Sequence, residues 1–208
     1  MYRKYIKRIL DFIFAVILLI IASPIMLLAA IAIKIEDPKG PVLFTQKRPG
    51  KDAKIFTIYK FRTMKVETEK DGRKLTDFER MTKVGSFLRK ASIDELPQLF
   101  NIIRGEMSFI GPRPLLVDYL KYYSKEQMRR HEVLPGISGW AQVNGRNAIT
   151  WEEKFNYDIW YVDNLSFLVD LKILFMTIYN VLKREGINNS KFDTMPFFTG
   201  SINNANFN

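Results

Sequence analysis

Hydrophobic residues are concentrated near the N-terminus of the chain. Residues 12–33 form a run of 22 without charge, in which only Ser23 and Pro24 interrupt the hydrophobic pattern. As a straight helix this run is roughly 33 Å long, at about 1.5 Å per residue. That length suffices for a hydrocarbon core of about 30 Å, so the pattern predicts a membrane segment.

Three topologies are compatible with this segment: a cleaved signal peptide, a single-spanning anchor and a re-entrant hairpin. The run is longer than the roughly 7–15 hydrophobic residues of a signal peptide, and its length alone favours a single span. A proline such as Pro24, however, removes a backbone hydrogen bond and kinks or breaks a helix. Ser23 can partly satisfy the carbonyls that Pro24 frees.

Basic residues on both sides of the run favour the re-entrant hairpin. Lys and Arg stay on the cytoplasmic side of a membrane, so a single span places one basic flank on the wrong side, whereas a hairpin does not. The flanks are Arg3, Lys4, Lys7 and Arg8 before the run, and Lys34, Lys39, Lys47, Arg48, Lys51 and Lys54 after it. We therefore expect a re-entrant membrane helix.

The rest of the pattern predicts shorter elements. Residues 42–45 and 54–59 read as strands around a turn, and residues 67–77 as an exposed charged loop. The fold class we expect is α+β and mostly helical, with the re-entrant membrane helix, interfacial amphipathic helices and a short β-hairpin. Helices are predicted at 81–90, from about Ser92 onward, at 115–132 and at 165–184, followed by a polar tail at 188–208. The helix at 165–184 is either a core helix or an interfacial helix on the bilayer.

Charge and composition narrow the chemistry. The chain has 208 residues and a formal net charge of +10, from 32 basic and 22 acidic side chains. It has no cysteine and one histidine, His131, so disulfides, thiolate metal sites, a cysteine nucleophile and a histidine-rich metal site are excluded. Catalysis must use carboxylates, lysine, arginine, hydroxyls or an oxygen-bound metal. The positive charge implies an anionic partner: nucleic acid, a lipid surface or a phosphate-rich substrate.

Asp94 and Glu95 are the first candidates for chemistry. With Ser92 they match the S-x-x-E capping box of a helix N-terminus, where the helix dipole favours acidic residues. The same environment keeps a carboxylate ionised. An ionised Asp can attack phosphorus to form an acyl phosphate, and an adjacent Glu can hold Mg²⁺. The pattern alone leaves both interpretations open.

Three further motifs carry candidate phosphate ligands, and each is also compatible with an ordinary surface loop or basic face. Two prolines hold Arg113 on a rigid backbone, which suits bidentate phosphate binding. Arg146 ends the glycine-rich stretch 136–146, which reads as a ligand-binding loop or a plain hairpin. Alternation along a strand places Lys60 and Arg62 on one face.

In this order, the motifs resemble the monotopic phosphoglycosyl transferases, also called the bacterial sugar transferase family, in their small single-domain form. The resemblance covers residue 2 to about residue 186. Within the family the chain is most similar to enzymes that transfer a diacetamido-trideoxyhexose phosphate (diacetylbacillosamine phosphate). The segments that carry it are the membrane run with Ser23-Pro24, FTQKRPG at 44–50, KFRTM at 60–64, DELPQ at 94–98, GPRP at 111–114 and the stretch 136–146.

The resemblance implies an activity and a location. Such enzymes transfer sugar-1-phosphate from a UDP-sugar to undecaprenyl phosphate and release UMP, as the first membrane step of bacterial glycan assembly. It implies a re-entrant helix at 1–36, a cytosolic catalytic domain at 37–186 and a C-terminal tail at 187–208. The expected location is the cytosolic face of the bacterial inner membrane, and an oligomer is possible.

The resemblance also implies site residues. Asp94 is the nucleophile that carries the covalent phosphosugar, Glu95 assists, and both hold Mg²⁺. The phosphate and nucleotide ligands that it implies are Lys60, Arg89, Arg113 and Arg146, and the shared strand face adds Arg62 to this set. The alternative is a non-enzymatic, membrane-anchored binding protein that uses its basic face for nucleic acid or acidic lipid. Because no nucleic-acid module is recognisable, we expect no nucleic-acid partner.

Overall fold

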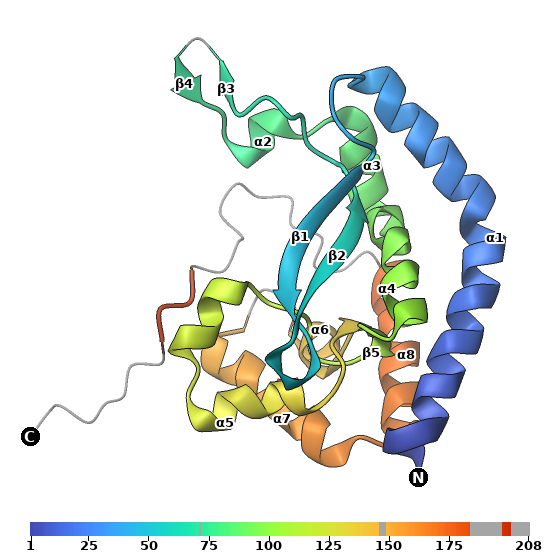
Figure 1. Ribbon diagram of the computed structural model, residues 1–208, viewed down its shortest axis with the longest axis vertical. Helices are drawn as coiled ribbons and strands as arrows, with labels where there is room; N and C mark the ends of the chain where they lie inside the picture. The colour runs from blue at the N-terminus through green and yellow to red at the C-terminus, as the bar shows by residue number, and fades with distance from the viewer. Residues whose placement is uncertain (71, 146–148, 184–196, 201–208) are drawn as a thin grey trace, which may run out of the picture. The chain divides into compact units, whose positions relative to one another are not determined.

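The computed structural model describes residues 1–70, 72–145, 149–183 and 197–200, and the described part is mostly helical, as expected (Figure 1). The chain divides into two compact units. Unit 1 contains Met1–Leu10, Lys47–Phe56 and Gly105–Asn208, and unit 2 contains Asp11–Gln46 and Thr57–Arg104. The division predicted from the sequence, into a membrane helix at 1–36, a catalytic domain at 37–186 and a tail at 187–208, follows function rather than compactness and stays a prediction.

The segment predicted to enter the membrane is one helix. A π-helical turn, η1 (Tyr2–Ile6), leads into α1 (Lys7–Glu36), which continues through Pro24 and curves along its length in Figure 1. The break that we considered at Pro24 is therefore absent. A proline leaves the carbonyl four residues earlier without its helical donor, and here the Ser23 hydroxyl donates to that carbonyl, Ile20 O, at 2.8 Å. Ser23 thus fills the role expected of it.

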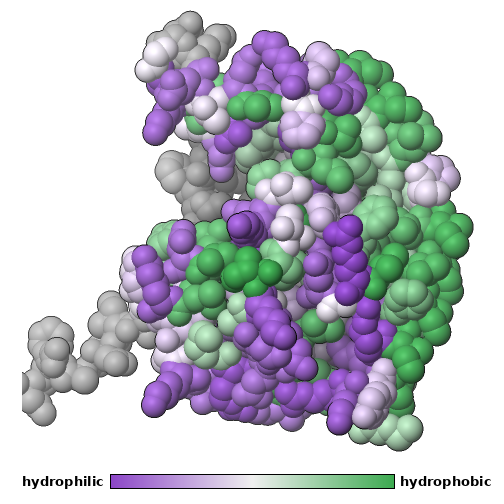
Figure 2. All heavy atoms as spheres, viewed as in Figure 1, coloured by the Kyte–Doolittle hydropathy of each residue, from purple (hydrophilic) through white to green (hydrophobic). Residues whose placement is uncertain are grey.

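Two sides of α1 have different surroundings. Ala15, Ala22 and Ala29 are seven residues apart, share one side of the helix and are buried. Among the described residues, the only helix long and apolar enough to cross a membrane is Tyr2–Glu36. Figure 2 shows a largely hydrophobic surface along α1. The large hydrophobic side chains exposed on α1 are Ile9, Phe12, Ile13, Phe14, Ile17, Leu18, Ile20, Ile21, Ile25, Leu27, Leu28, Ile31 and Ile35.

The first two strands form the predicted hairpin. β1 (Leu43–Pro49) pairs with β2 (Ile55–Phe61), and the short helical turn η2 (Lys51–Ala53) connects them. Gly50 N–H donates to Lys54 O at 2.8 Å and closes the turn. The buried ring of His131 reaches the same turn, because its Nδ1 lies 3.0 Å from Gly50 O. Burial, assisted by Arg130, lowers the pKa of His131 to about 4.

Unit 2 packs the end of α1 against a short helix. Ala29 and Ile33 from α1 form a buried cluster with Phe61 and with Leu88 of α3 (Lys83–Lys90). Glu36 fixes the two helices because its carboxylate accepts the first two N–H groups of α3, at 2.7 and 2.8 Å. The charged segment at 67–77 contains a small antiparallel hairpin, β3 (Glu69–Lys70) and β4 (Arg73–Lys74), rather than only a loop, and α2 (Asp77–Arg80) follows.

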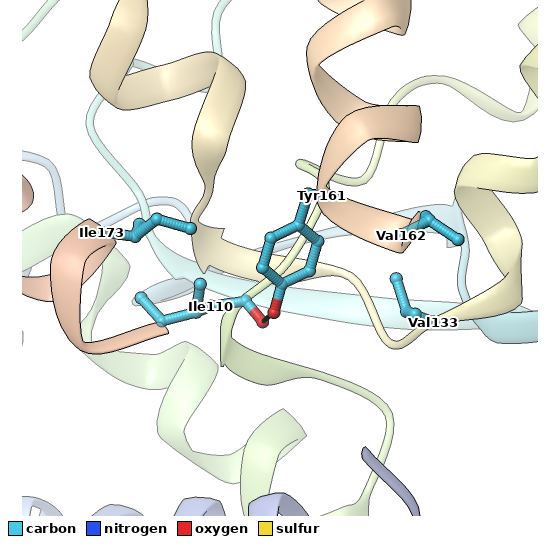
Figure 3. Close-up of a cluster of buried hydrophobic side chains, with 5 residues drawn as sticks. All are labelled: Ile110, Val133, Tyr161, Val162 and Ile173. Atoms are coloured by element: carbon cyan, nitrogen blue, oxygen red, sulfur yellow. Dashed lines mark hydrogen bonds between the residues drawn. The ribbon is translucent and has the colours of Figure 1, made fainter. Parts of the chain in front are cut away.

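Unit 1 has its core around Tyr161 of α7 (Trp151–Asn164). Tyr161 is 1% exposed and lies among Ile110, Val133, Val162 and Ile173 (Figure 3). Its hydroxyl lies 3.1 Å from Ile110 O and 2.7 Å from a carboxylate oxygen of Asp170. The core thus joins α7, α8 (Phe167–Leu182) and the strand β5 (Ser108–Ile110).

The start of the N-terminal helix is attached to this core. Asp170 accepts hydrogen bonds from Tyr2 at 2.6 Å and from Lys7 at 2.7 Å. Lys7 and Asp170 are both buried, and a buried ion pair loses far more when one partner is removed than an exposed pair does. The polar group at the start of α8 is therefore an anchor for the N-terminus.

The long hydrophobic helix near the C-terminus forms as predicted. The helix at 165–184 is confirmed as α8, with Ser166 as its N-cap. One side of α8 is buried at Asp170 and Ile173, while Leu168 and Leu182 are among its exposed side chains. It is therefore not a fully enclosed core helix, and its predicted place on the bilayer stays a prediction.

The single helix predicted at 115–132 is wrong. This region consists of η4 (Val117–Tyr122), α5 (Lys125–Met128) and η5 (Arg129–Glu132). Ser124 explains the interruption, because it caps a new helix in a reciprocal capping box with Gln127.

The aromatic residues of the tail include one in the core. Phe198 is 1% exposed and packs in a second cluster with Leu115, Tyr119 and Phe155. Of the predicted tail, the structure describes residues 197–200, whereas 188–196 and 201–208 lie outside the described residues.

Candidate active site

Asp94 and Glu95 lie on a tight turn in unit 2. They belong to the 3₁₀-helix η3 (Ile93–Gln98), between α3 and α4 (Leu99–Arg104). Asp94 is 9% exposed, so the protein surrounds most of a side chain that usually lies in solvent. Carboxylates are rarely buried to this extent unless they are paired or have a functional role.

The capping box predicted for Ser92 and Glu95 is wrong. Ser92 has a φ of +55°, and its side chain caps nothing. Instead its N–H donates to Arg89 O at 3.1 Å, so Ser92 ends the preceding helix. A non-glycine residue in the left-handed region costs of the order of 1–3 kcal/mol and is frequent at functional sites. The strain therefore lies two residues before Asp94.

Glu95 is held by a lysine of the neighbouring hairpin. Lys60 of β2 donates from Nζ to the Glu95 carboxylate at 2.6 Å, and both side chains are about one-fifth exposed, at 21%. Arg89 lies in the same unit, and its Nε donates to Thr63 Oγ1 at 3.0 Å. The structure thus brings Lys60 and Glu95 together and fixes Arg89 against the KFRTM segment.

Arg62 has a different environment from Lys60. Its guanidinium donates to the Asp37 carboxylate at 2.5 Å and to the Asp37 carbonyl at 2.7 Å. It is 7% exposed and fixes the chain just after α1. These contacts give a structural role to Arg62, and its predicted role as a phosphate ligand gains no support from them.

Arg113 belongs to unit 1 and is presented as the sequence predicts. Pro112 and Pro114 are buried on either side, whereas Arg113 is exposed. Its carbonyl accepts a hydrogen bond from Arg130 at 2.7 Å. Arg130 also donates from Nε and Nη2 to Asp158 at 3.0 and 2.8 Å. The backbone that carries Arg113 is therefore fixed by a buried ion pair.

Close backbone packing explains the glycines near Arg113. A Cβ added to Gly111 would lie 2.3 Å from the backbone oxygen of Leu134. A Cβ added to Gly136 or to Gly139 would lie 2.1 or 2.2 Å from a backbone atom of Gly111. β5 pairs in parallel with β6 (Gly136–Ser138), and α6 (Trp140–Asn144) follows. The plain hairpin considered for 136–146 is therefore wrong, and Arg146 lies outside the described residues.

Sequence reasoning missed two cations near Arg113. Lys154 is on α7, where Trp151, Lys154 and Asp158 follow at helical spacing, and Arg48 is near the end of β1. Arg113 acts on the pKa of both. The spacing along α7 was the available signal, but the sequence analysis predicted no helix at 151–164.

The carboxylates match a magnesium ion that is shared with substrate. No group of three or more His, Cys, Asp or Glu residues that could hold a metal occurs in the described part of the chain. Mg²⁺ typically binds through one or two carboxylates and completes its shell with water and substrate phosphates. Asp94 and Glu95 supply two adjacent carboxylates, so the donor set fits that mode and not a closed, all-protein metal site.

A comparison with known families supplies the deciding observation. The family model described as "Bacterial sugar transferase" matches residues 2–184, which include all of unit 2, most of unit 1 and the hydrophobic helix α1. The chain belongs to the bacterial sugar transferase family. The match extends through the Asp94–Glu95 turn and the Arg113 loop, as the sequence resemblance predicted.

Relatives within the bacterial sugar transferase family share much of the sequence. An uncharacterized sugar transferase, EpsL, of Bacillus subtilis is 54% identical over 94% of this chain and 96% of its own length. An undecaprenyl-phosphate N-acetylgalactosaminephosphotransferase of Aeromonas hydrophila is 44% identical over 88% of this chain. An Escherichia coli UDP-glucose:undecaprenyl-phosphate glucose-1-phosphate transferase is 41% identical over 85% of this chain.

The chain spans less than half of the relatives whose reactions are named. It covers 45% of the Aeromonas protein and 40% of the Escherichia coli protein. Their names specify N-acetylgalactosamine and glucose, so the diacetamido sugar stays a prediction.

Proposed function

We propose that this chain transfers a sugar-1-phosphate from a UDP-sugar to undecaprenyl phosphate and releases UMP, at the cytosolic face of the bacterial inner membrane. The observation that carries the proposal is the strained, buried turn with Asp94 beside a Glu95 held by Lys60. It lies within a sequence that matches the family over residues 2–184. The named reactions of the relatives support the substrate classes.

The reaction divides into two displacements at one phosphorus atom. A carboxylate oxygen of Asp94 attacks the β-phosphorus of the UDP-sugar; the new O–P bond forms as the bond to UMP breaks. An oxygen of undecaprenyl phosphate then attacks the same phosphorus and displaces Asp94 as a carboxylate. Each step needs in-line positioning and neutralisation of charge on the phosphoryl oxygens, and no proton, oxidant or reductant is consumed.

The side chains have separate roles in this scheme. Lys60 orients Glu95 through their 2.6 Å contact, and Arg89, Arg113 and Arg146 bind phosphate oxygens. Asp94 and Glu95 hold Mg²⁺, which supplies charge neutralisation for the diphosphate when bound. The diacetamido-trideoxyhexose is the sugar that we propose.

The proposal includes a re-entrant membrane segment, supported by the basic residues at both ends of the run. The absence of native cysteine allows single labels at Lys4→Cys and Lys39→Cys. With membrane-impermeant maleimide, both positions should react from the cytosolic side alone. Labelling of the two positions from opposite sides would establish a single span instead.

A UMP-release assay tests the activity. Full-length protein in nanodiscs is supplied with undecaprenyl phosphate, Mg²⁺ and a panel of UDP-sugars that includes the diacetamido, N-acetylgalactosamine, glucose and galactose forms. We expect UMP equimolar with lipid-linked product for one sugar above the others, and none after chelation of the metal. No turnover with any sugar, together with anion binding that falls steeply with salt, would support the non-enzymatic alternative.

A further inference from the structure

The C-terminal tail places one aromatic ring in the interior of unit 1. Phe198 is 1% exposed, although it lies well beyond the end of α8 in the sequence. Its ring centre lies between 5.0 and 6.4 Å from the ring centres of five aromatic residues, which we call the aromatic cage: Tyr119, Tyr122, Tyr123, Trp151 and Phe155. Buried aromatic side chains contribute strongly to packing, so the cage fixes this point of the tail firmly.

The cage also contacts the arginine that fixes the Arg113 backbone. The guanidinium carbon of Arg130 lies 5.9 Å from the ring centre of Tyr123 and 5.9 Å from that of Phe155. The same guanidinium donates to Arg113 O at 2.7 Å and to the buried Asp158 carboxylate at 3.0 and 2.8 Å. One layer of aromatic rings and one guanidinium therefore join the tail ring to the Arg113 carbonyl.

The chain just after Arg113 has a second support in the same place. Leu115 belongs to the buried cluster that contains Phe198, and only Pro114 separates it from Arg113. The prolines on both sides of Arg113 restrict the backbone, so its conformation depends on how its carbonyl and Leu115 are held. Because protein interiors are close-packed, a cavity in place of the Phe198 ring loosens both supports.

We propose that Phe198 is a positioning residue that holds the Arg113 loop, residues 111–114, in the conformation that binds substrate phosphate. It acts through the cage and Arg130 rather than by contact with substrate. A guanidinium on a fixed backbone binds phosphate with less loss of entropy than one on a mobile backbone. The inference rests on the proposed function for the role of Arg113, whereas the packing path from the tail to the loop depends on no activity.

Hydrogen exchange tests the packing path without turnover. Backbone amide exchange of the full-length protein in nanodiscs is measured by mass spectrometry, in peptides that cover residues 108–119. We expect Phe198→Ala to accelerate exchange in these peptides about tenfold or more, because the local opening of the loop becomes easier. Peptides from α4 in unit 2 should exchange as in the unmodified protein. Phe198→Leu keeps a hydrophobic side chain in the cage and should restore most of the protection.

Phe197→Ala is the matched control. Phe197 is the adjacent tail residue, and its ring centre also lies near Tyr119, at 4.7 Å, but its side chain is 51% exposed. This variant should change exchange in residues 108–119 less than about twofold, as surface substitutions usually do. Unchanged exchange in Phe198→Ala overturns the proposal. Equal acceleration in every peptide of unit 1 also overturns it, since that result reports a general loss of stability.

Kinetics test whether Phe198 acts through Arg113. In the UMP-release assay, kcat/KM is measured for the UDP-sugar and for undecaprenyl phosphate. Arg113→Met should lower one of the two values, and Phe198→Ala should lower the same value about fivefold or more. The double variant should lose no more than Arg113→Met alone, because residues that act on one contact are not additive.

The outcomes of this comparison are distinct. Losses that add in the double variant, or a loss for the other substrate, contradict an effect through Arg113. If Phe198→Ala keeps both kcat/KM values, the functional role of Phe198 is wrong even when exchange is faster. Absence of turnover in the unmodified protein refutes the proposed function, and the exchange measurement then still decides whether the tail holds the loop.

Discussion

Asp94→Asn is expected to reduce UMP release by about 10³-fold or more. The amide keeps the shape of the side chain but lacks the anionic oxygen that attacks phosphorus, and loss of a nucleophile typically has an effect of this size or larger. Asp94 is largely buried, at 9% exposed, so an isosteric replacement disturbs packing least. Initial rates of UMP release, measured with the preferred UDP-sugar and undecaprenyl phosphate, give the value.

Two controls separate chemistry from folding. Asp118→Asn makes the same change at an exposed carboxylate on η4 and should leave the rate within about twofold, as surface substitutions usually do. The melting temperature of Asp94→Asn should remain close to that of the unmodified protein. If Asp94→Asn and Asp94→Ala both retain turnover, Asp94 is not the nucleophile.

Arg130→Met is expected to destabilise unit 1 by about 3–5 kcal/mol, because it leaves the Asp158 carboxylate buried without its guanidinium partner. For a chain of this size that corresponds to a fall of about 6–20 °C in melting temperature. The substitution also removes the hydrogen bond to Arg113 O. Thermal unfolding followed by circular dichroism measures the change.

The adjacent arginine provides the control. Arg129 pairs with Glu126, Glu132 and Asp163, but its side chain is 33% exposed, and surface ion pairs contribute little. Arg129→Met should therefore change the melting temperature much less. The double variant Arg130→Met/Asp158→Leu should recover most of the loss, since no charge then stays buried. Equal effects of Arg129→Met and Arg130→Met would contradict this account.

Local patterns predicted the elements that depend on local physics. The uncharged run predicted the hydrophobic helix α1, the strands and turn around Gly50 predicted the β1–β2 hairpin, and the hydrophobic stretch at 165–184 predicted α8. The consequence of Pro24 was only partly predicted. The Ser23 contact to Ile20 O was expected, but a continuous helix was not.

Long-range contacts account for part of the errors. The pattern of Ser92 and Glu95 matches a capping box, yet the Lys60 contact holds Glu95 and the end of α3 fixes Ser92 in the left-handed region. The parallel pairing of β5 and β6 joins residues far apart in sequence. A local reading of 136–146 therefore offered a hairpin instead.

In the candidate site too, local patterns identified residues, whereas contacts between distant segments determined their partners. Asp94, Glu95 and Lys60 were named from the sequence, and the contact between Lys60 and Glu95 followed from the fold. Arg62 looked equivalent to Lys60 by strand alternation, but Asp37, the residue that follows α1, is its partner. Lys154 was missed because its significance depends on neighbours from two other parts of the chain.

The central claim is that Asp94 carries the sugar phosphate between the two substrates. The most direct measurement is mass spectrometry of full-length protein incubated with Mg²⁺ and the preferred UDP-sugar, without undecaprenyl phosphate. We predict a mass increase of one sugar phosphate, located on the peptide that contains Asp94, together with one equivalent of UMP, and loss of the adduct when undecaprenyl phosphate is added. Full turnover with no adduct on that peptide, and UMP release only when both substrates are present, would contradict the account.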